Sequence, residues 1–256
     1  MLIPVLTGCV LLFLLLPTLL VIPVSLGSEK YLTFPPAHLS FKWYAAYFSD
    51  PEWMQATRLS LVVASVATVI STLVAVPATL AFGRGRLPMG SGLRSLMLAP
   101  MILPHIVIAV ALYITFSRWN LVGSVTGFVV AHSVLCVPFL FLTLSSAVAK
   151  LDPSLELAAM SLGASRLAVF RHVTLPILMP SIAGGMAFAF ITSLDEAVVS
   201  IFLSSSTQKV IAKKMFEDID FDLSPIIAAV STMILLASLT LIGLTLVWRM
   251  ARSTRR

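Results

Sequence analysis

The sequence LELAAMSLGASRLAVFRHVTLP, residues 155–176, separates two long apolar stretches and is unlike either of them. It contains one Glu, two Arg, one His and a Gly, whereas the stretches on both sides are almost free of charge. Such a segment is typical either of a solvated loop between two membrane spans or of a surface that docks another protein. Its helix signals and small residues decide between these two interpretations.

Local signals predict that this segment is a helix–turn–helix. Asp152 is a favourable N-cap and is followed by a proline, which suits the first helical position. A helix of two turns is expected from there. Gly163 is suited to end it, and Ser165 to cap a second short helix that continues to about Val173.

The small residues of the first helix favour docking over a solvated loop. Ala158 and Ala159 are adjacent, and Gly163 follows one turn after Ala159 on the same face. A face of small residues lets another surface approach closely. A plain loop is seldom this apolar or this well capped, so we expect a docking element.

The composition places the rest of the chain in a membrane. Of the 256 residues, 59% are hydrophobic and only 11% are charged, and the mean hydropathy is +1.02. A helix needs about 20 apolar residues to cross a hydrocarbon layer roughly 30 Å thick. The first run lacks the basic start and small-residue cleavage site of a signal peptide. An all-α membrane protein, one domain over 1–256, is predicted, with spans at about 2–24, 57–82, 96–117, 123–149, 176–203 and 225–248.

The distribution of Lys and Arg predicts the orientation of these spans. With the C-terminus in the cytoplasm, ten of the 17 cationic side chains fall on the inner side, and Arg84, Arg86 and Arg94 crowd one short inner loop. An even number of spans then places both termini in the cytoplasm. The net charge of +6 follows from this topology and does not indicate a nucleic-acid partner.

The segment 150–176 resembles the cytoplasmic "EAA" signature of ATP-binding-cassette importer permeases. That signature is Glu-Ala-Ala, three residues, Gly, nine residues and then Ile-x-Leu-Pro. Here Ala-Ala at 158–159, Gly163 and Val-Thr-Leu-Pro at 173–176 have the same spacing. The resemblance extends over about 57–248 and implies a type I importer fold with six transmembrane helices and a short cytoplasmic coupling helix.

In that family the segment seats in a cleft of the ATPase subunit. One position departs from the signature: Leu157 stands where the family has Glu, and Glu156 directly precedes it. The alternatives, that Glu156 takes over the charged contact or that it does not, remain open from the sequence. The resemblance implies that the ATPase contact includes Glu156, Leu157, Ala158, Ala159, Gly163, Ala164, Leu175 and Pro176.

The chain also lacks the means to bind ATP through a P-loop, because it contains no Gly-Lys pair. No cofactor is expected on this chain, and ATP and Mg are expected on a partner. The resemblance implies four kinds of partner in the bacterial inner membrane: an ATPase dimer, a second homologous permease, a periplasmic substrate-binding protein and the lipid bilayer.

The fifth span contains two adjacent acids, Asp195 and Glu196, between apolar residues. A charge near the bilayer centre costs about 2.5–3.5 kcal/mol, so the acids require a reason. One interpretation is a capping box, Ser193 with Glu196, that starts a half-helix after a break. The other is a site that recognises a cation in a water-filled pathway. The two are compatible.

This neighbourhood resembles permeases of the polyamine branch, the spermidine/putrescine type, in which a Ser-x-Asp-Asp/Glu segment recurs. Two carboxylates suit two ammonium groups, and Phe190 is a candidate for a cation–π contact. The predicted solute is therefore a small polyamine-like cation. The same branch also imports opines, 2-aminoethylphosphonate, iron and thiamine, and these stay as alternatives.

Two other classes of protein fit the sequence less well. An intramembrane enzyme is disfavoured because no H-E-x-x-H or G-x-S-x-G occurs, and His105 and His132 are expected to be packed residues with single hydrogen bonds. An ATP-independent secondary transporter would leave the coupling-type segment unexplained. The outer loop 204–224, with four acids, is expected to be either solvated or a contact for the binding protein.

Overall fold

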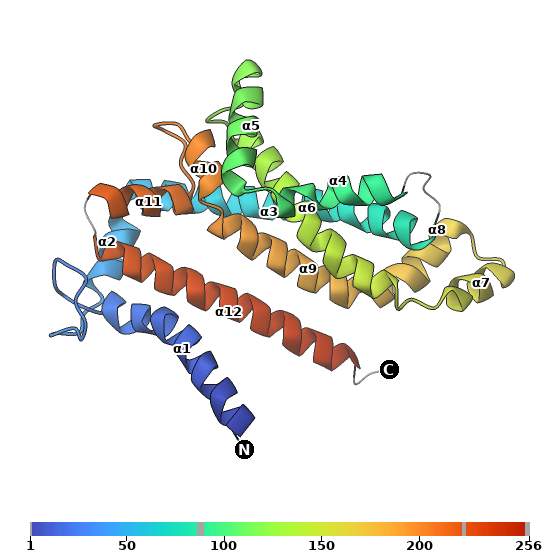
Figure 1. Cartoon of the computed structure of the whole chain (residues 1–256), viewed down its shortest axis with the longest axis horizontal. Helices are drawn as coiled ribbons and strands as arrows, with labels where there is room; N and C mark the ends of the chain where they lie inside the picture. The colour runs from blue at the N-terminus through green and yellow to red at the C-terminus, as the bar shows by residue number, and fades with distance from the viewer. Residues whose placement is uncertain (1, 86–89, 222–223, 254–256) are drawn as a thin grey trace.

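The computed structural model describes residues 2–85, 90–221 and 224–253, which are mainly helical, and the longest connection between helices runs over 26–41. The elements run roughly along one long axis (Figure 1). In chain order they are α1 (Leu2–Ser25), α2 (Lys42–Ser49), α3 (Pro51–Gly83), α4 (Gly90–Ile102), α5 (His105–Arg118), α6 (Val125–Val148), α7 (Pro153–Ser161), α8 (Arg166–Val169), the π-helical turn η1 (Phe170–Thr174), α9 (Leu175–Asp195), α10 (Val198–Leu203), α11 (Ile211–Phe221) and α12 (Ile226–Ser253).

The predicted all-α architecture is confirmed for this part of the chain. Five stretches are long and apolar enough to cross a membrane, namely α1, α3, α6, the continuous run from α8 to α9, and α12. The pair α4 and α5 makes a sixth when it is counted as one span. These correspond in order to the six predicted runs.

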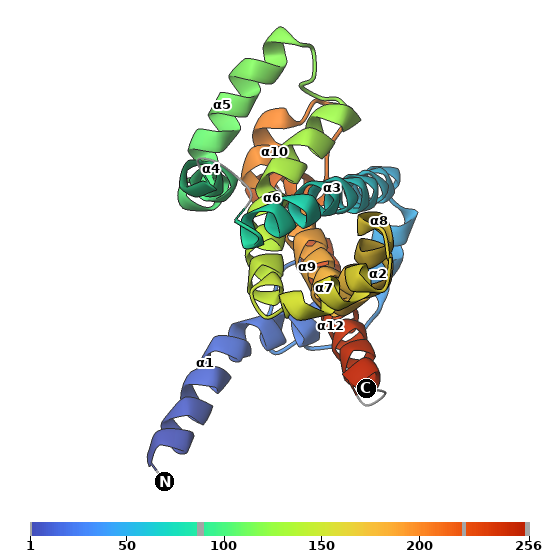
Figure 2. The same cartoon turned by 90° about the vertical axis from the view of Figure 1, so that its right-hand side faces the viewer.

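The third predicted span, 96–117, is not one helix. It is divided into α4 and α5, which meet at 104° across Leu103 and Pro104. Pro104 has no N–H to continue the helix and disfavours helical dihedrals at the residue before it. As a result α5 projects away from the bundle, as Figure 2 shows.

The core lies where α3, α6 and α9 pack together. Small residues on α3, including Ala67 and Ala75, are fully buried and let the neighbouring helices approach. Gly185 of α9 serves the same purpose, because a Cβ there would lie 2.9 Å from Leu140 of α6. A second core lies nearer the N-terminal end of α3. It joins α3 to α5, α6 and α10 around the buried Phe128. The packing of these helices holds in place the spans that carry the polar residues of the candidate site.

The two polar ends of the molecule lie far apart along the long axis. In Figure 1, α7 and α8 occupy one end, and α2 and α11 the other. Between them α1 diverges from the bundle, and its apolar side chains are largely exposed. Arg86 of the predicted inner loop lies outside the described residues.

Candidate functional site

The α7 helix begins as its sequence predicts. The Asp152 carboxylate accepts a hydrogen bond from the Ser154 backbone N–H at 2.9 Å, and Pro153 is the first helical residue. Hydrogen bonds from the Ser154 backbone and side chain hold the pKa of Asp152 below its usual value. The predicted N-cap is therefore confirmed.

Gly163 ends this helix in a left-handed conformation, with φ of +88°. Its N–H donates to the Met160 carbonyl oxygen, and the Ala164 N–H donates to that of Ala159 at 3.1 Å. A Cβ at this position would meet nothing within 4 Å. Glycine is therefore favoured here by backbone conformation and not by crowding.

The second predicted helix begins at its expected cap, because the Ser165 hydroxyl accepts from the Ala168 N–H at 3.3 Å. Its end differs from the prediction. The chain does not stop near Val173 but continues from α8 through η1 directly into α9. Leu175 and Pro176 thus lie at the start of α9 inside one continuous helical run, in which the proline donates no backbone hydrogen bond. The turn at 162–165 is therefore joined rigidly to the fifth span.

The surface of α7 and the turn after it is apolar and uncovered. None of the residues in α7 is buried. Leu162 is 90% exposed, Leu167 74% and Leu157 60%. Ala158 is exposed as well, and Ala159 is half-buried. A partner that covered these side chains would remove apolar surface from water, which is the ordinary driving force for docking.

Glu156 does not belong to this exposed surface. Its Oε1 atom accepts hydrogen bonds from the Arg84 guanidinium and from the Thr174 hydroxyl. Thr174 is fully buried, and the Glu156 side chain is 14% exposed. Glu156 therefore faces the membrane helices, while Leu157, in the position of the signature's Glu, faces outward.

At the other end of α9 the predicted break is present. Helix α9 ends at Asp195 and α10 begins at Val198. The buried Glu196 accepts from the Val199 N–H at 3.0 Å through Oε1, so it caps α10. Its Oε2 atom lies 3.0 Å from Nδ1 of His105, the first residue of α5. Glu196 thus has a structural role in the break itself.

The predicted capping box is wrong in both members, because Ser193 is not the N-cap of α10 and Glu196 precedes that helix and accepts from its Val199 N–H. The Ser193 hydroxyl lies inside α9 and contacts His132 Nδ1 at 2.8 Å instead of an N–H of α10. His132 Nε2 contacts the Ser200 hydroxyl at 3.2 Å, and that hydroxyl donates to the Glu196 carbonyl oxygen. His132 therefore bridges the two sides of the break with both ring nitrogens, where a single bond was expected. A lone His in an apolar span was the only signal of this in the sequence.

Asp195 differs from Glu196 in its exposure and in its contacts. Its side chain is exposed, and in the described part of the chain its carboxylate has no hydrogen-bond or ion-pair partner. Phe188 lies on the same face of α9, two turns earlier, and is 51% exposed. The predicted Phe190 is half-buried and lies on another face. Because the acid and the ring are two turns apart, roughly 10 Å, they can contact two different ammonium groups of one elongated solute.

The outer acids are largely neutralised by neighbouring lysines. Glu217 pairs with Lys209 at 2.9 Å and Lys213 at 3.4 Å, and Lys214 pairs with Asp218 at 2.8 Å. Partial burial works to raise the pKa of Glu217, but the two lysines outweigh it and hold that pKa below its usual value. Asp222 lies outside the described residues.

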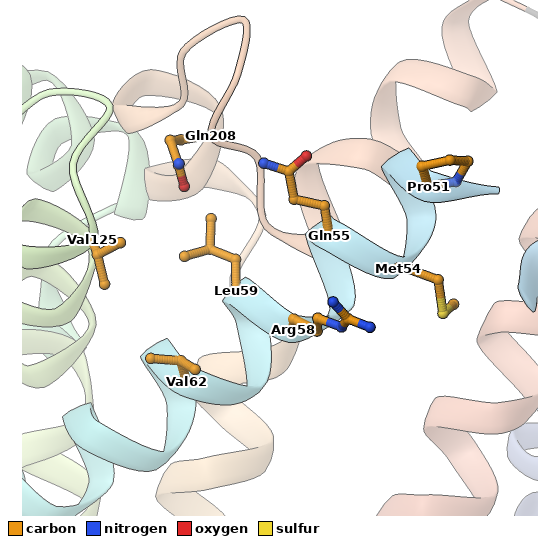
Figure 3. Close-up of a pocket in the computed structure, with 8 residues that line it drawn as sticks. All are labelled: Pro51, Met54, Gln55, Arg58, Leu59, Val62, Val125 and Gln208. Carbon is orange, nitrogen blue, oxygen red and sulfur yellow. The ribbon is translucent and has the colours of Figure 1, made fainter.

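A pocket of about 610 Å³ opens at the N-terminal end of α3 (Figure 3). Its charged lining residue is Arg58, and Gln55 and Gln208 supply amides. Its eight lining residues include no acid. This pocket is unsuited to a cation, so the Asp195 face of α9 is the better candidate for one.

Known proteins resemble this chain along most of its length. The sequence pattern of the family described as binding-protein-dependent transport system inner membrane component matches residues 2–252. The putrescine transport system permease protein PotI of Escherichia coli K12 is 30% identical over 251 residues, which cover 95% of this chain and 89% of PotI. The spermidine/putrescine transport system permease protein PotC of the same strain is 27% identical over 230 residues, covering 90% and 87%.

A solved structure agrees with the fold. A subunit of a bacterial ABC transporter involved in the import of the acidic polysaccharide alginate superposes with a TM-score of 0.69. The superposition covers 98% of this chain and 94% of that one at 16% sequence identity. Similarity at this level concerns the arrangement of helices alone.

Proposed function

The chain belongs to the family of binding-protein-dependent transport system inner membrane components and is a permease subunit of an ATP-binding-cassette importer, and we propose that it carries a polyamine-like cation. It is a transport subunit of the inner membrane and not an enzyme. The secondary-transporter alternative is thereby set aside. The identity of the solute and the residues that meet it form the proposal.

One observation supports the choice of solute: the Asp195 carboxylate is exposed beside a break in an apolar span and is unpaired among residues 2–85, 90–221 and 224–253. A charge in that position is costly unless water or a counter-ion reaches it. An ammonium group of the solute would supply that counter-ion, with Phe188 adding a cation–π contact to a second ammonium group. The relatives PotI and PotC, named for putrescine and spermidine/putrescine transport, support the same class of solute.

The remaining partners follow from the two ends of the molecule. We propose that an ATPase dimer, which holds ATP and Mg, docks on the exposed leucines of α7 and the following turn, and that both termini lie on that cytoplasmic side. A periplasmic binding protein would meet the opposite end, near α2 and α11. A second permease would cover the exposed sides of α1 and α5.

The proposal is tested by solute uptake into vesicles that contain the complete importer. Asp195→Asn should lower uptake of a polyamine at least about tenfold, because one charge-assisted contact is lost. Asp195→Glu, which keeps the negative charge at the same position, is the matched control and should retain most of the uptake. Competition with opines, 2-aminoethylphosphonate, ferric iron and thiamine checks the alternatives. Full uptake by the Asp195→Asn variant would remove this residue from the pathway.

A further inference from the structure

One carboxylate oxygen joins three separate elements at the cytoplasmic end. Glu156 of α7 accepts from Arg84, the C-cap residue of α3, and from Thr174, the last residue of η1. The two donors are 72 and 18 residues away in the chain. The contact therefore connects α7 directly to the second span and to the start of the fifth.

This contact is buried on one side and open to water on the other. Thr174 is fully buried and the Glu156 side chain is 14% exposed, whereas the Arg84 side chain is 32% exposed. The buried Thr174 hydroxyl therefore holds the carboxylate in place, and the ion pair with Arg84 is partly screened by solvent. Arg84 is also held at the C-terminal end of α3, where the helix dipole favours a cation.

The rest of α7 gives little alternative connection to the membrane helices. None of the residues in α7 is buried, so no apolar core anchors this helix. Its backbone continues to α6 through residues 149–152 and to α8 through the short turn at 162–165. A displacement of α7 can therefore reach the spans through these two backbone connections or through the Glu156 carboxylate, which is the contact that joins α7 to Arg84 at the end of α3.

Asp195, the candidate solute-binding residue, lies at the far end of this connection. The 21-residue helix α9 begins directly after Thr174 and ends at Asp195, a length of about 30 Å. The π-helical turn before it has wider hydrogen-bonded rings than an α-helix, and such turns often occur at functional sites. A pull on Thr174 thus acts at the base of the helix that carries the unpaired acid.

We propose that Glu156 is a positioning residue that transmits movement of α7 to α3 and α9 from within the permease, and that it does not contact the ATPase. This inference rests on the proposed docking of an ATPase on α7. In this arrangement the exposed leucines hold the partner, and the Glu156–Arg84–Thr174 contact converts its movement into a movement of two spans.

Three variants of the complete importer test this role. Glu156→Gln and Arg84→Gln weaken the contact, and Thr174→Val removes the hydroxyl at nearly constant shape. Each should leave the ATPase bound and hydrolysing while uptake per ATP falls about tenfold for the charge variants, a usual size for coupling between sites. Arg166→Gln is the matched control, because Arg166 is exposed on α8; its uptake per ATP should not change.

The exchanged pair Arg84→Glu with Glu156→Arg provides the rescue. Recovery of at least a third of the wild-type uptake per ATP, with each single reversal inactive, supports a direct role of the contact. Loss of ATPase co-purification in Glu156→Gln would overturn the inference, because Glu156 would then be a docking residue. Unchanged uptake per ATP in Glu156→Gln and Arg84→Gln would overturn it as well. If the wild-type permease bound no ATPase, the proposed function would fail instead, which is a different result.

Discussion

The Nδ1 atom of His105 lies 3.0 Å from the Oε2 atom of Glu196, and this contact joins the break between α4 and α5 to the break between α9 and α10. Both interrupted helices thus meet at one polar contact. His132 adds a second connection across the α9–α10 break through Ser193 and Ser200. Adjacent acids in the sequence therefore differ in their contacts: Glu196 holds the break, whereas Asp195 has no partner among the described residues and is the residue that we propose meets the solute.

This division predicts opposite phenotypes for the two acids. Glu196→Ala removes the acceptor for the Val199 N–H and the partner of His105, and should lower the free energy of unfolding by about 3 kcal/mol. Asp195→Ala should change it by less than about 0.5 kcal/mol, because no described contact is lost. Thermal unfolding of the purified permease in detergent measures both. Equal destabilisation by the two variants would contradict the assignment.

The bridge made by His132 predicts a similar loss of stability. His132→Phe fills a comparable volume but leaves the buried Ser193 hydroxyl without its partner, at a cost of about 1–3 kcal/mol. His172→Phe is the control, because His172 is exposed on η1. The same unfolding measurement applies. Wild-type stability in the His132 variant would show that the bridge contributes nothing.

Local chemistry was sufficient to predict where α7 begins and ends and where α8 begins. Asp152, Gly163 and Ser165 act on backbone groups within three or four residues of themselves, so their roles are visible without the fold. The direction of Glu156 was not visible, because its partner Arg84 is 72 residues away. The same holds for Glu196 and His105: a lone histidine near a proline carries no sign of its distant partner.

Prolines show a second limit of sequence interpretation. Pro77 and Pro138 remain inside α3 and α6, whereas Pro104 divides the third span. Each removes one backbone N–H. In a membrane, neighbouring helices decide whether the freed groups are satisfied in place. Whether those backbone groups find partners depends on tertiary contacts. Hydropathy alone therefore predicts six apolar runs without showing which of them bends.

The conformation of Gly163 predicts a graded series of substitutions. A side chain meets no neighbour there, so the penalty comes from the positive φ alone, about 1–2 kcal/mol for Ala and less for Asn. This penalty should appear as faster amide hydrogen exchange in residues 158–164 of the Gly163→Ala variant. Uptake by that variant should also fall. Gly92→Ala is the control, since Gly92 has equal space and no positive φ. If Asn and Ala behaved alike and Gly92→Ala matched both, φ would not be the cause.

The exposed leucines predict that docking on α7 is apolar. Leu157→Asp should weaken ATPase co-purification by roughly 10–100-fold, since burying one leucine contributes about 1.5–3 kcal/mol. Because Leu157 is 60% exposed, the permease itself should stay as stable as the wild type. Leu157→Ala should give a smaller loss, and Leu157→Asn, which is polar but uncharged, separates the lost apolar contact from the added charge. Titration of the purified permease variants with the ATPase measures the affinities. Wild-type affinity in Leu157→Asp would place the docking surface elsewhere on the cytoplasmic end.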